Sequence, residues 1–224
     1  MSDAVEPAFP AQSGPLVLYG PAGRIEALVG VPDPAVARRA VAIICHPHPL
    51  HGGTLHNKVV AMVERSLLEL GLRTLRFNFR GVGATEGVHD HGDGETLDAI
   101  AIGEWLGRAC PGDALWLAGF SFGSMVAARA ARHLPAEFLL SIAPPIGKYP
   151  VFDALPPPPC PWLGVQGEDD DVVAPQAVYD FIARQPDPPT LVRMPDTGHF
   201  FHRKLLDLRG VIKHAARDHL PPGA

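Results

Sequence analysis

The segment LWLAGFSFG at residues 115–123 is the most informative part of the sequence about the fold. Its first six residues carry no charged or polar side chain, which is typical of a strand buried on both faces. The alanine-rich segment at residues 122–133 predicts a helix directly afterwards. Ser121 therefore lies at a sharp junction of strand and helix, where Gly119 and Gly123 relieve the crowding of such a turn. An ordinary turn serine that caps the helix is the simpler alternative.

Apolar runs and amphipathic segments alternate on both sides of this junction. Strands are predicted at residues 16–19, 24–31, 41–45, 74–79, 115–120, 138–142, 162–166 and 191–194, and helices at residues 59–70, 97–105 (with Leu97, Ala101 and Trp105 on one face), 122–133, 176–184 and 204–220. This alternation predicts an α/β fold with a mostly parallel central sheet and helices on both faces. We expect a single domain over residues 1–224, with residues 1–14 as a loose tail. The polar residues 89–93 are expected to cap the helix that follows them.

Composition excludes several classes of protein. The chain has 224 residues, is 46% hydrophobic and carries a net charge of −5 without a cluster of Lys and Arg. We therefore expect no nucleic-acid partner. No apolar stretch is long enough to cross a bilayer, and the N-terminus lacks the pattern of a signal peptide, so we expect no membrane partner. Three cysteines (Cys45, Cys110 and Cys160) without paired spacing favour free thiols in the cytoplasm.

Polar residues with catalytic chemistry follow several of the predicted strands. Parallel sheets bind ligands beyond the carboxyl ends of their strands, where His46, Ser121 and His199 would meet. A serine needs a base within hydrogen-bond reach and an acid that orients the base. His199 is a candidate base, and the run at residues 169–171, three aspartates, offers candidate acids. Spacing alone leaves the choice among the three aspartates open, because such a run is also typical of a solvated turn.

These motifs resemble the α/β-hydrolase superfamily over essentially the whole chain. The chain is similar in particular to a group of small bacterial serine hydrolases that lack a lid domain. The resembling segments are HPHPLHGG at residues 46–53, RFNFRGVG at 76–83, GFSFG at 119–123, GEDDDVV at 167–173 and GHFF at 198–201. The resemblance implies that Ser121 is the nucleophile and His199 the base. It also implies that the catalytic carboxylate stands three positions after Gly167, which selects Asp170.

An acyl-transfer intermediate needs two N–H donors for its oxyanion. The Phe122 N–H, directly after the nucleophile, is one candidate. The second should come from the loop after the strand at residues 41–45. Pro47 and Pro49 have no N–H to donate, which leaves His46 and His48. His48 is the better candidate because His46 directly ends the strand, and the resemblance points to the same place.

The rest of the site is predicted from loop length and side-chain type. Residues 144–159 are short and rich in proline, which predicts an open, shallow pocket without a helical lid. The expected pocket residues are His46, Leu50, His51, Tyr149, Phe152 and Phe200. The spacing of His46, His48 and His51 could also hold a zinc ion. Because the serine motif already accounts for a reactive site, we predict no metal and no cofactor.

The resulting hypothesis is a serine hydrolase of the carboxylesterase type. It would cleave ester or thioester bonds of a small-molecule acyl substrate through a Ser121, Asp170 and His199 triad and an acyl-enzyme. Two alternatives use the same triad, namely acyl transfer to another acceptor and amide cleavage. A third alternative belongs to a different class, a binding module that has the triad without using it.

Overall fold

The computed structural model describes residues 8–223, and within them eight strands form one sheet. The strands are β1 (Gly14–Gly20), β2 (Gly23–Gly30), β3 (Ala40–Cys45), β4 (Arg73–Phe77), β5 (Ala114–Phe120), β6 (Ala136–Ile142), β7 (Trp162–Gly167) and β8 (Thr190–Met194). Their order across the sheet is β1-β2-β4-β3-β5-β6-β7-β8. The pairs β1–β2 and β2–β4 are antiparallel and all other neighbours are parallel, which confirms the predicted fold class.

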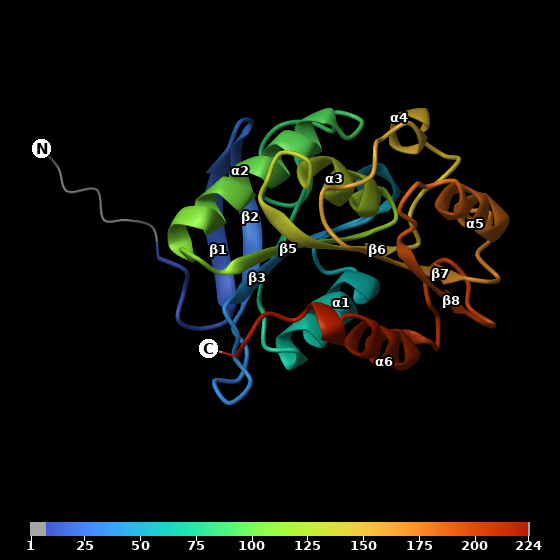
Figure 1. Ribbon diagram of the computed structural model, residues 1–224. Coiled ribbons are helices and arrows are strands. Elements are labelled where there is room, and N and C mark those ends of the chain that lie inside the picture. The colour runs from blue at the N-terminus through green and yellow to red at the C-terminus, as the bar shows by residue number, and fades with distance from the viewer. Residues whose placement is uncertain (1–7, 224) are drawn as a thin grey trace, which may run out of the picture.

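Helices cover both faces of the sheet (Figure 1). They are α1 (Lys58–Glu69), α2 (Asp93–Ala109), α3 (Phe122–Ala130), α4 (Pro150–Asp153), α5 (Pro175–Ala183) and α6 (Leu205–Ala215), with short 3-10 helices η1 (Pro49–His51) and η2 (Arg217–His219). Helices α1 and α6 pack together on one face, and α2, α3 and α5 cover the other. The described residues contain no helix with the length and apolar character needed to cross a membrane.

The central strands are apolar throughout because each contributes to two cores. In β3, Val41 and Ile43 face the helices α2 and α3, whereas Ala42 and Ile44 face α1 and α6. Successive side chains of a strand point to opposite faces, so a strand between two helical layers has no solvent-facing position. The same holds for every residue of β5. This burial brings Ser121 to the end of one of the most deeply packed strands.

Helices α2 and α6 differ in detail from their predicted segments, and α3 ends at Ala130, three residues before its predicted end. Helix α2 begins at Asp93 and does not bury the predicted stripe, since Leu97 is 53% exposed. It buries Ala99, Ile102 and Leu106 instead, because alanines and glycines on several of its sides leave the inward face ambiguous in the sequence. Helix α6 ends at Ala215, and the predicted continuation to residue 220 is the separate turn η2.

The predicted N-terminal tail lies partly outside the described residues, which begin at residue 8. Phe9 packs against the indole of Trp105, with 6.3 Å between ring centroids, and Gly14 is the first residue of β1. The prediction that residues 144–159 form no helical lid agrees with the structure. Within that described segment the only helix is α4, a single turn.

Candidate active site

Ser121 occupies the predicted sharp turn between β5 and α3. Its backbone has φ 53° and ψ −122°, a conformation that residues other than glycine rarely adopt. A Cβ atom on Gly119 would collide with the carbonyl oxygen of Gly123. A Cβ atom on Gly123 would collide with the carbonyl oxygens of Cys45 and His46. Gly119 is therefore required because the first turn of α3 packs against it, and Gly123 because α3 begins against the end of β3.

Ser121, His199 and Asp170 form a hydrogen-bonded chain. The Ser121 Oγ lies 3.0 Å from His199 Nε2, and His199 Nδ1 lies 2.9 Å from Asp170 Oδ2. A carboxylate can only accept, so Nδ1 carries the hydrogen and Nε2 is left to accept from the serine hydroxyl. His199 and Asp170 are 4% and 6% exposed. The three predicted catalytic residues thus meet from three strand ends in the arrangement that general-base catalysis requires.

The Asp170 carboxylate accepts hydrogen bonds from three groups besides the His199 imidazole. Its Oδ1 accepts hydrogen bonds from the N–H groups of Val172 and Val173, at 2.9 and 2.7 Å. Its Oδ2 also accepts from Gln166 Nε2, at 2.9 Å. Burial would raise the pKa of this carboxyl, but the hydrogen bonds from His199, Val173 and Gln166 outweigh it and lower the pKa below its usual value. Asp170 is therefore ionised, whereas its neighbours in the run, Asp169 and Asp171, are exposed.

The two predicted oxyanion donors lie on neighbouring segments. Phe122 begins α3, and His48 lies in the loop after β3, the strand against which α3 packs. Phe122 is the first residue of α3, so its N–H has no acceptor inside the helix. The backbone carbonyl of His48 accepts from the N–H groups of His51 and Gly53, and the side-chain Nδ1 of His48 accepts from the Leu50 N–H. Over residues 8–223, the N–H of His48 itself donates to no other group. The rings of His48 and Phe122 pack at 4.8 Å between centroids.

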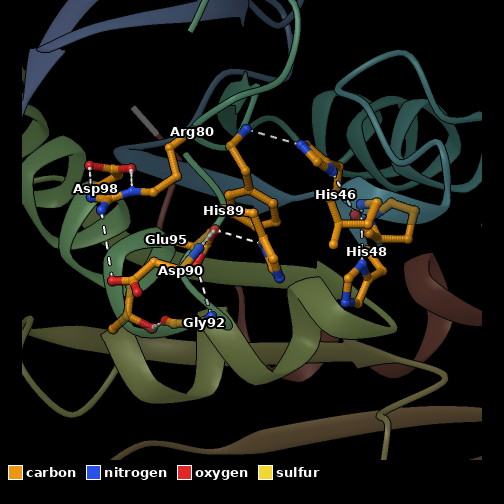
Figure 2. Close-up of polar contacts among 12 residues, drawn as sticks. His46, His48, Arg80, His89, Asp90, Gly92, Glu95 and Asp98 are labelled. Atoms are coloured by element: carbon orange, nitrogen blue, oxygen red, sulfur yellow. Dashed lines mark hydrogen bonds and ion pairs between the residues drawn. The ribbon is translucent and has the colours of Figure 1, made fainter. Parts of the chain in front are cut away.

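His46 does not line a pocket, contrary to the prediction. It is 0% exposed and both ring nitrogens are used inside the fold (Figure 2). Its Nε2 accepts from the Phe79 N–H at 3.0 Å, so Nδ1 carries the hydrogen and donates to the Pro47 carbonyl at 2.6 Å. Burial lowers the pKa of His46 to about 4, which keeps the ring neutral. His46 therefore ties the loop after β3 to the backbone after β4.

The histidines of the predicted zinc alternative do not form a metal site. His48 and His51 stack on each other at 4.6 Å between ring centroids. Burial and the neighbouring imidazoles lower the pKa of His48 to about 4. No group of three or more His, Cys, Asp or Glu side chains suited to a metal ion occurs among the described residues.

The remaining predicted pocket residues separate into surface and core. Leu50 and Phe200 are exposed, at 68% and 48%, and Tyr149 is half-buried against the ring of Phe122 at 5.8 Å. Phe152 is only 1% exposed and packs with Phe181, so the prediction that it lines the pocket is wrong. Helix α4 points this side chain inward over α5, so Phe152 packs in the core.

A second histidine–carboxylate pair lies beside the loop after β3 that carries His48, and sequence reasoning missed it (Figure 2). His89 Nδ1 lies 2.9 Å from Glu95 Oε1, and the His89 ring packs against His48 and Phe122 at 5.0 and 5.6 Å. Helix α2 begins within the polar residues 89–93, as predicted, but the side chain that caps it is Glu95, which accepts from the N–H of Gly92. A glutamate three residues into a helix is a sequence signal of such a cap. Nothing in the sequence indicated that His89 would reach His48.

The sheet, the strained serine and the hydrogen-bonded triad define an α/β hydrolase. No protein-family model matches the chain. It is 51% identical to an α/β serine hydrolase without a lid from Xanthomonas campestris, covering 97% of this chain and 100% of that one with a TM-score of 0.93. An α/β serine hydrolase homologue from Coxiella burnetii is 40% identical, covering 93% and 99% of the two chains with a TM-score of 0.89.

A curated protein is also similar to this chain over most of its length. An uncharacterised protein of Rickettsia prowazekii is 39% identical over 171 residues, which are 74% of this chain and 70% of that protein. The chain belongs to the α/β serine hydrolases without a lid.

Proposed function

We propose that this protein hydrolyses esters or thioesters of small acyl groups through Ser121, His199 and Asp170. The observation that carries the proposal is the hydrogen-bonded chain of these three side chains, at 3.0 and 2.9 Å. The ionised Asp170 holds the His199 tautomer whose Nε2 can accept the serine proton. A structural serine or histidine would not need this order of donors and acceptors, nor the strained backbone of Ser121.

The proposed reaction follows from these positions. Ser121 Oγ attacks the acyl carbonyl while its proton passes to His199 Nε2. The N–H groups of His48 and Phe122 hold the oxyanion of the tetrahedral intermediate. His199 then gives its proton to the leaving group, and the acyl-enzyme remains. A water molecule, deprotonated by His199, attacks the acyl-enzyme, releases the acid and returns Ser121 to its starting state.

The lack of a lid supports a preference for short acyl groups. Residues 144–159 contain only the single turn α4, and the apolar side chains of Leu50 and Phe200 are exposed, at 68% and 48%. We therefore expect p-nitrophenyl acetate and butyrate to be cleaved faster than the corresponding esters of long-chain acids. Faster turnover of long-chain esters would contradict this part of the proposal.

A fluorophosphonate probe with peptide mapping tests the nucleophile directly. We expect a single label on Ser121 and no label on Ser121→Ala, with unchanged circular dichroism as the control for folding. A label elsewhere, or one that survives Ser121→Ala, would sink the proposal. Ester products formed with added alcohols would show acyl transfer, and absence of both labelling and turnover over an ester panel would favour a binding module.

We also propose a cytoplasmic location. Cys45, Cys110 and Cys160 are all free thiols, and Cys45 and Cys110 are buried. Free cysteines are typical of a reducing compartment. Fractionation of cells that express the tagged protein tests this location.

A further inference from the structure

A hollow of about 440 Å³ lies beside the catalytic histidine, outside the groups that the reaction uses. One wall is the residues around the start of α1, including His56 and Lys58, and the other is the segment that follows His199. Phe200 joins this hollow to the triad, because its ring meets the His199 ring edge-on at 5.1 Å between centroids. An aromatic side chain that is 48% exposed next to the catalytic base offers an apolar surface to a bound group.

The hollow adjoins the residue that would protonate the leaving group. The departing atom must come within hydrogen-bond reach of His199 Nε2, since that nitrogen supplies its proton. The proposed oxyanion donors, the N–H groups of Phe122 on α3 and of His48 in the loop after β3, do not line the hollow. A leaving group that extends from His199 over the Phe200 ring would reach it.

The hollow is cationic although the chain as a whole is acidic. Its lining includes Lys58 and Arg203, and none of the described residues that line it is an aspartate or a glutamate. In the part of the chain that the structure describes, neither Lys58 nor Arg203 forms an ion pair. The neighbouring acid on α6, Asp207, pairs with Lys204. Two exposed cations are thus available to a ligand.

The groups around the hollow include further titratable side chains. His56 and His202 line it and are exposed. The carboxylate of Glu26 interacts with His56, but it is also held by Asn78 Nδ2 and the Ala84 N–H. The excess of positive charge in the hollow therefore rests on Lys58 and Arg203.

We propose that this hollow is a subsite for an anionic leaving group. The substrate class is an acyl ester or thioester whose leaving group bears a carboxylate or a phosphate. Phe200 contacts the apolar part of the leaving group, and Lys58 and Arg203 bind its anion. This inference rests on the proposed function, because a leaving group exists only if Ser121 is acylated.

Charge neutralisation on matched substrates tests the subsite. The substrates are 4-acetoxybenzoate and 4-acetoxyphenyl phosphate as anionic members, and methyl 4-acetoxybenzoate as the neutral reference. We expect Lys58→Gln/Arg203→Gln to lower kcat/KM for the anionic esters about tenfold relative to the neutral ester. Each ester's kcat/KM in the variant is divided by its kcat/KM in the wild type, so differences in intrinsic reactivity between the esters cancel. The carboxylate and phosphate members show which anion the subsite prefers.

Two controls make the comparison specific. Arg108→Gln/Arg217→Gln removes the same charge from exposed residues outside the hollow and should leave the ratio unchanged. The selectivity of the wild type should also fall between low salt and 0.5 M salt, because exposed charges are screened. A matched pair with the anion on the acyl side, phenyl hemisuccinate and phenyl acetate, should show no change of ratio in the hollow variant.

The outcomes separate this inference from the proposed function. Equal ratios in the wild type and Lys58→Gln/Arg203→Gln would overturn the subsite while leaving the esterase intact, and so would a change confined to the acyl-side pair. Binding of phenyl phosphate to Ser121→Ala, measured by calorimetry, needs no turnover. If no ester is cleaved but phenyl phosphate binds and Lys58→Gln/Arg203→Gln abolishes that binding, the anion site stands and the esterase proposal fails. Failure of phenyl phosphate to bind would overturn the site.

Discussion

Two histidine–carboxylate pairs in this protein share one geometry and differ in what the second ring nitrogen faces. In each pair Nδ1 lies 2.9 Å from a carboxylate oxygen, and each carboxylate side chain is 0% exposed. His199 Nε2 meets the Ser121 hydroxyl, whereas the buried Nε2 of His89 has no hydrogen-bond partner in the described residues. A carboxylate beside an imidazole therefore does not make a catalytic base unless a nucleophile lies at the far nitrogen.

The two pairs also differ in how the fold assembles them. Asp170 and His199 follow different strands, and the parallel sheet brings them together at its carboxyl edge. His89 and Glu95 are six residues apart in one helix cap. The first pair depends on the whole sheet and the second on one local turn. Replacing the corresponding members of the two pairs should therefore have different consequences.

Removal of each imidazole gives the largest expected difference. We expect His199→Gln to lower kcat for p-nitrophenyl acetate about 10⁵-fold, because Ser121 loses its base. His89→Gln should change kcat less than about threefold, because its Nε2 touches no reacting group. Steady-state kinetics with the concentration of active sites fixed by titration measures both. A loss with His89→Gln comparable to that with His199→Gln would mean that the second pair also acts in the reaction.

Removal of each carboxylate charge should also affect the two pairs differently. Asp170→Asn should lower kcat about 10⁴-fold, since the amide can donate to Nδ1 and so favour the tautomer whose Nε2 cannot accept the serine proton. Glu95→Gln should leave kcat within about threefold of the wild type. Circular dichroism checks that both variants fold. If Asp170→Asn keeps a tenth or more of the wild-type kcat, the carboxylate does not set the tautomer of His199.

Much of the fold and the triad could be predicted from the sequence because their signals are local. The unbroken apolar run before Ser121 marks a strand covered on both faces, and glycines two positions on either side of the serine mark the turn. The order of Ser121 and His199 along the chain, with an acid between them, limits the candidates for the base. The choice of Asp170 needed the resemblance, because three adjacent aspartates have the same local chemistry.

What escaped prediction depends on long-range packing. Phe152 is as apolar as any pocket residue, and only its position over α5 shows that it packs in the core. The burial of His46 follows from a hydrogen bond to Phe79, 33 residues away. His89 was assigned to a helix cap, and its contact with His48 requires the cap and the loop after β3 to be in place together. No spacing in the sequence reports such contacts.

His46 extends the comparison to an imidazole without a carboxylate partner. Burial lowers its pKa from 6.5 to about 4, against the opposing effects of the Pro47 carbonyl and the Glu95 charge. The unfolded chain therefore binds the proton more strongly than the folded protein. Protonation of His46 therefore favours the unfolded state. The free energy of unfolding is independent of this proton above pH 6.5 and falls by about 3 kcal/mol as the pH drops toward 4.

Denaturant unfolding between pH 4 and 7.5 measures this contribution. His46→Gln should be less stable than the wild type at pH 7, and the difference in the free energy of unfolding should shrink as the pH falls from 6.5 to 4. A difference that stays constant over this range would show that the proton on His46 does not couple to folding.

The smallest expected effect concerns the stability that the second pair contributes. Glu95 accepts from His89 and from the N–H groups of Asp90 and Gly92, so the glutamine of Glu95→Gln leaves at least one of these donors facing an amide N–H. We expect Glu95→Gln to lower the free energy of unfolding by about 2 kcal/mol. His89→Phe should cost about 1 kcal/mol, because it removes one hydrogen bond and retains a ring against His48. Urea unfolding with an unchanged m-value measures both. If both variants are as stable as the wild type, the pair is not needed for the cap of α2.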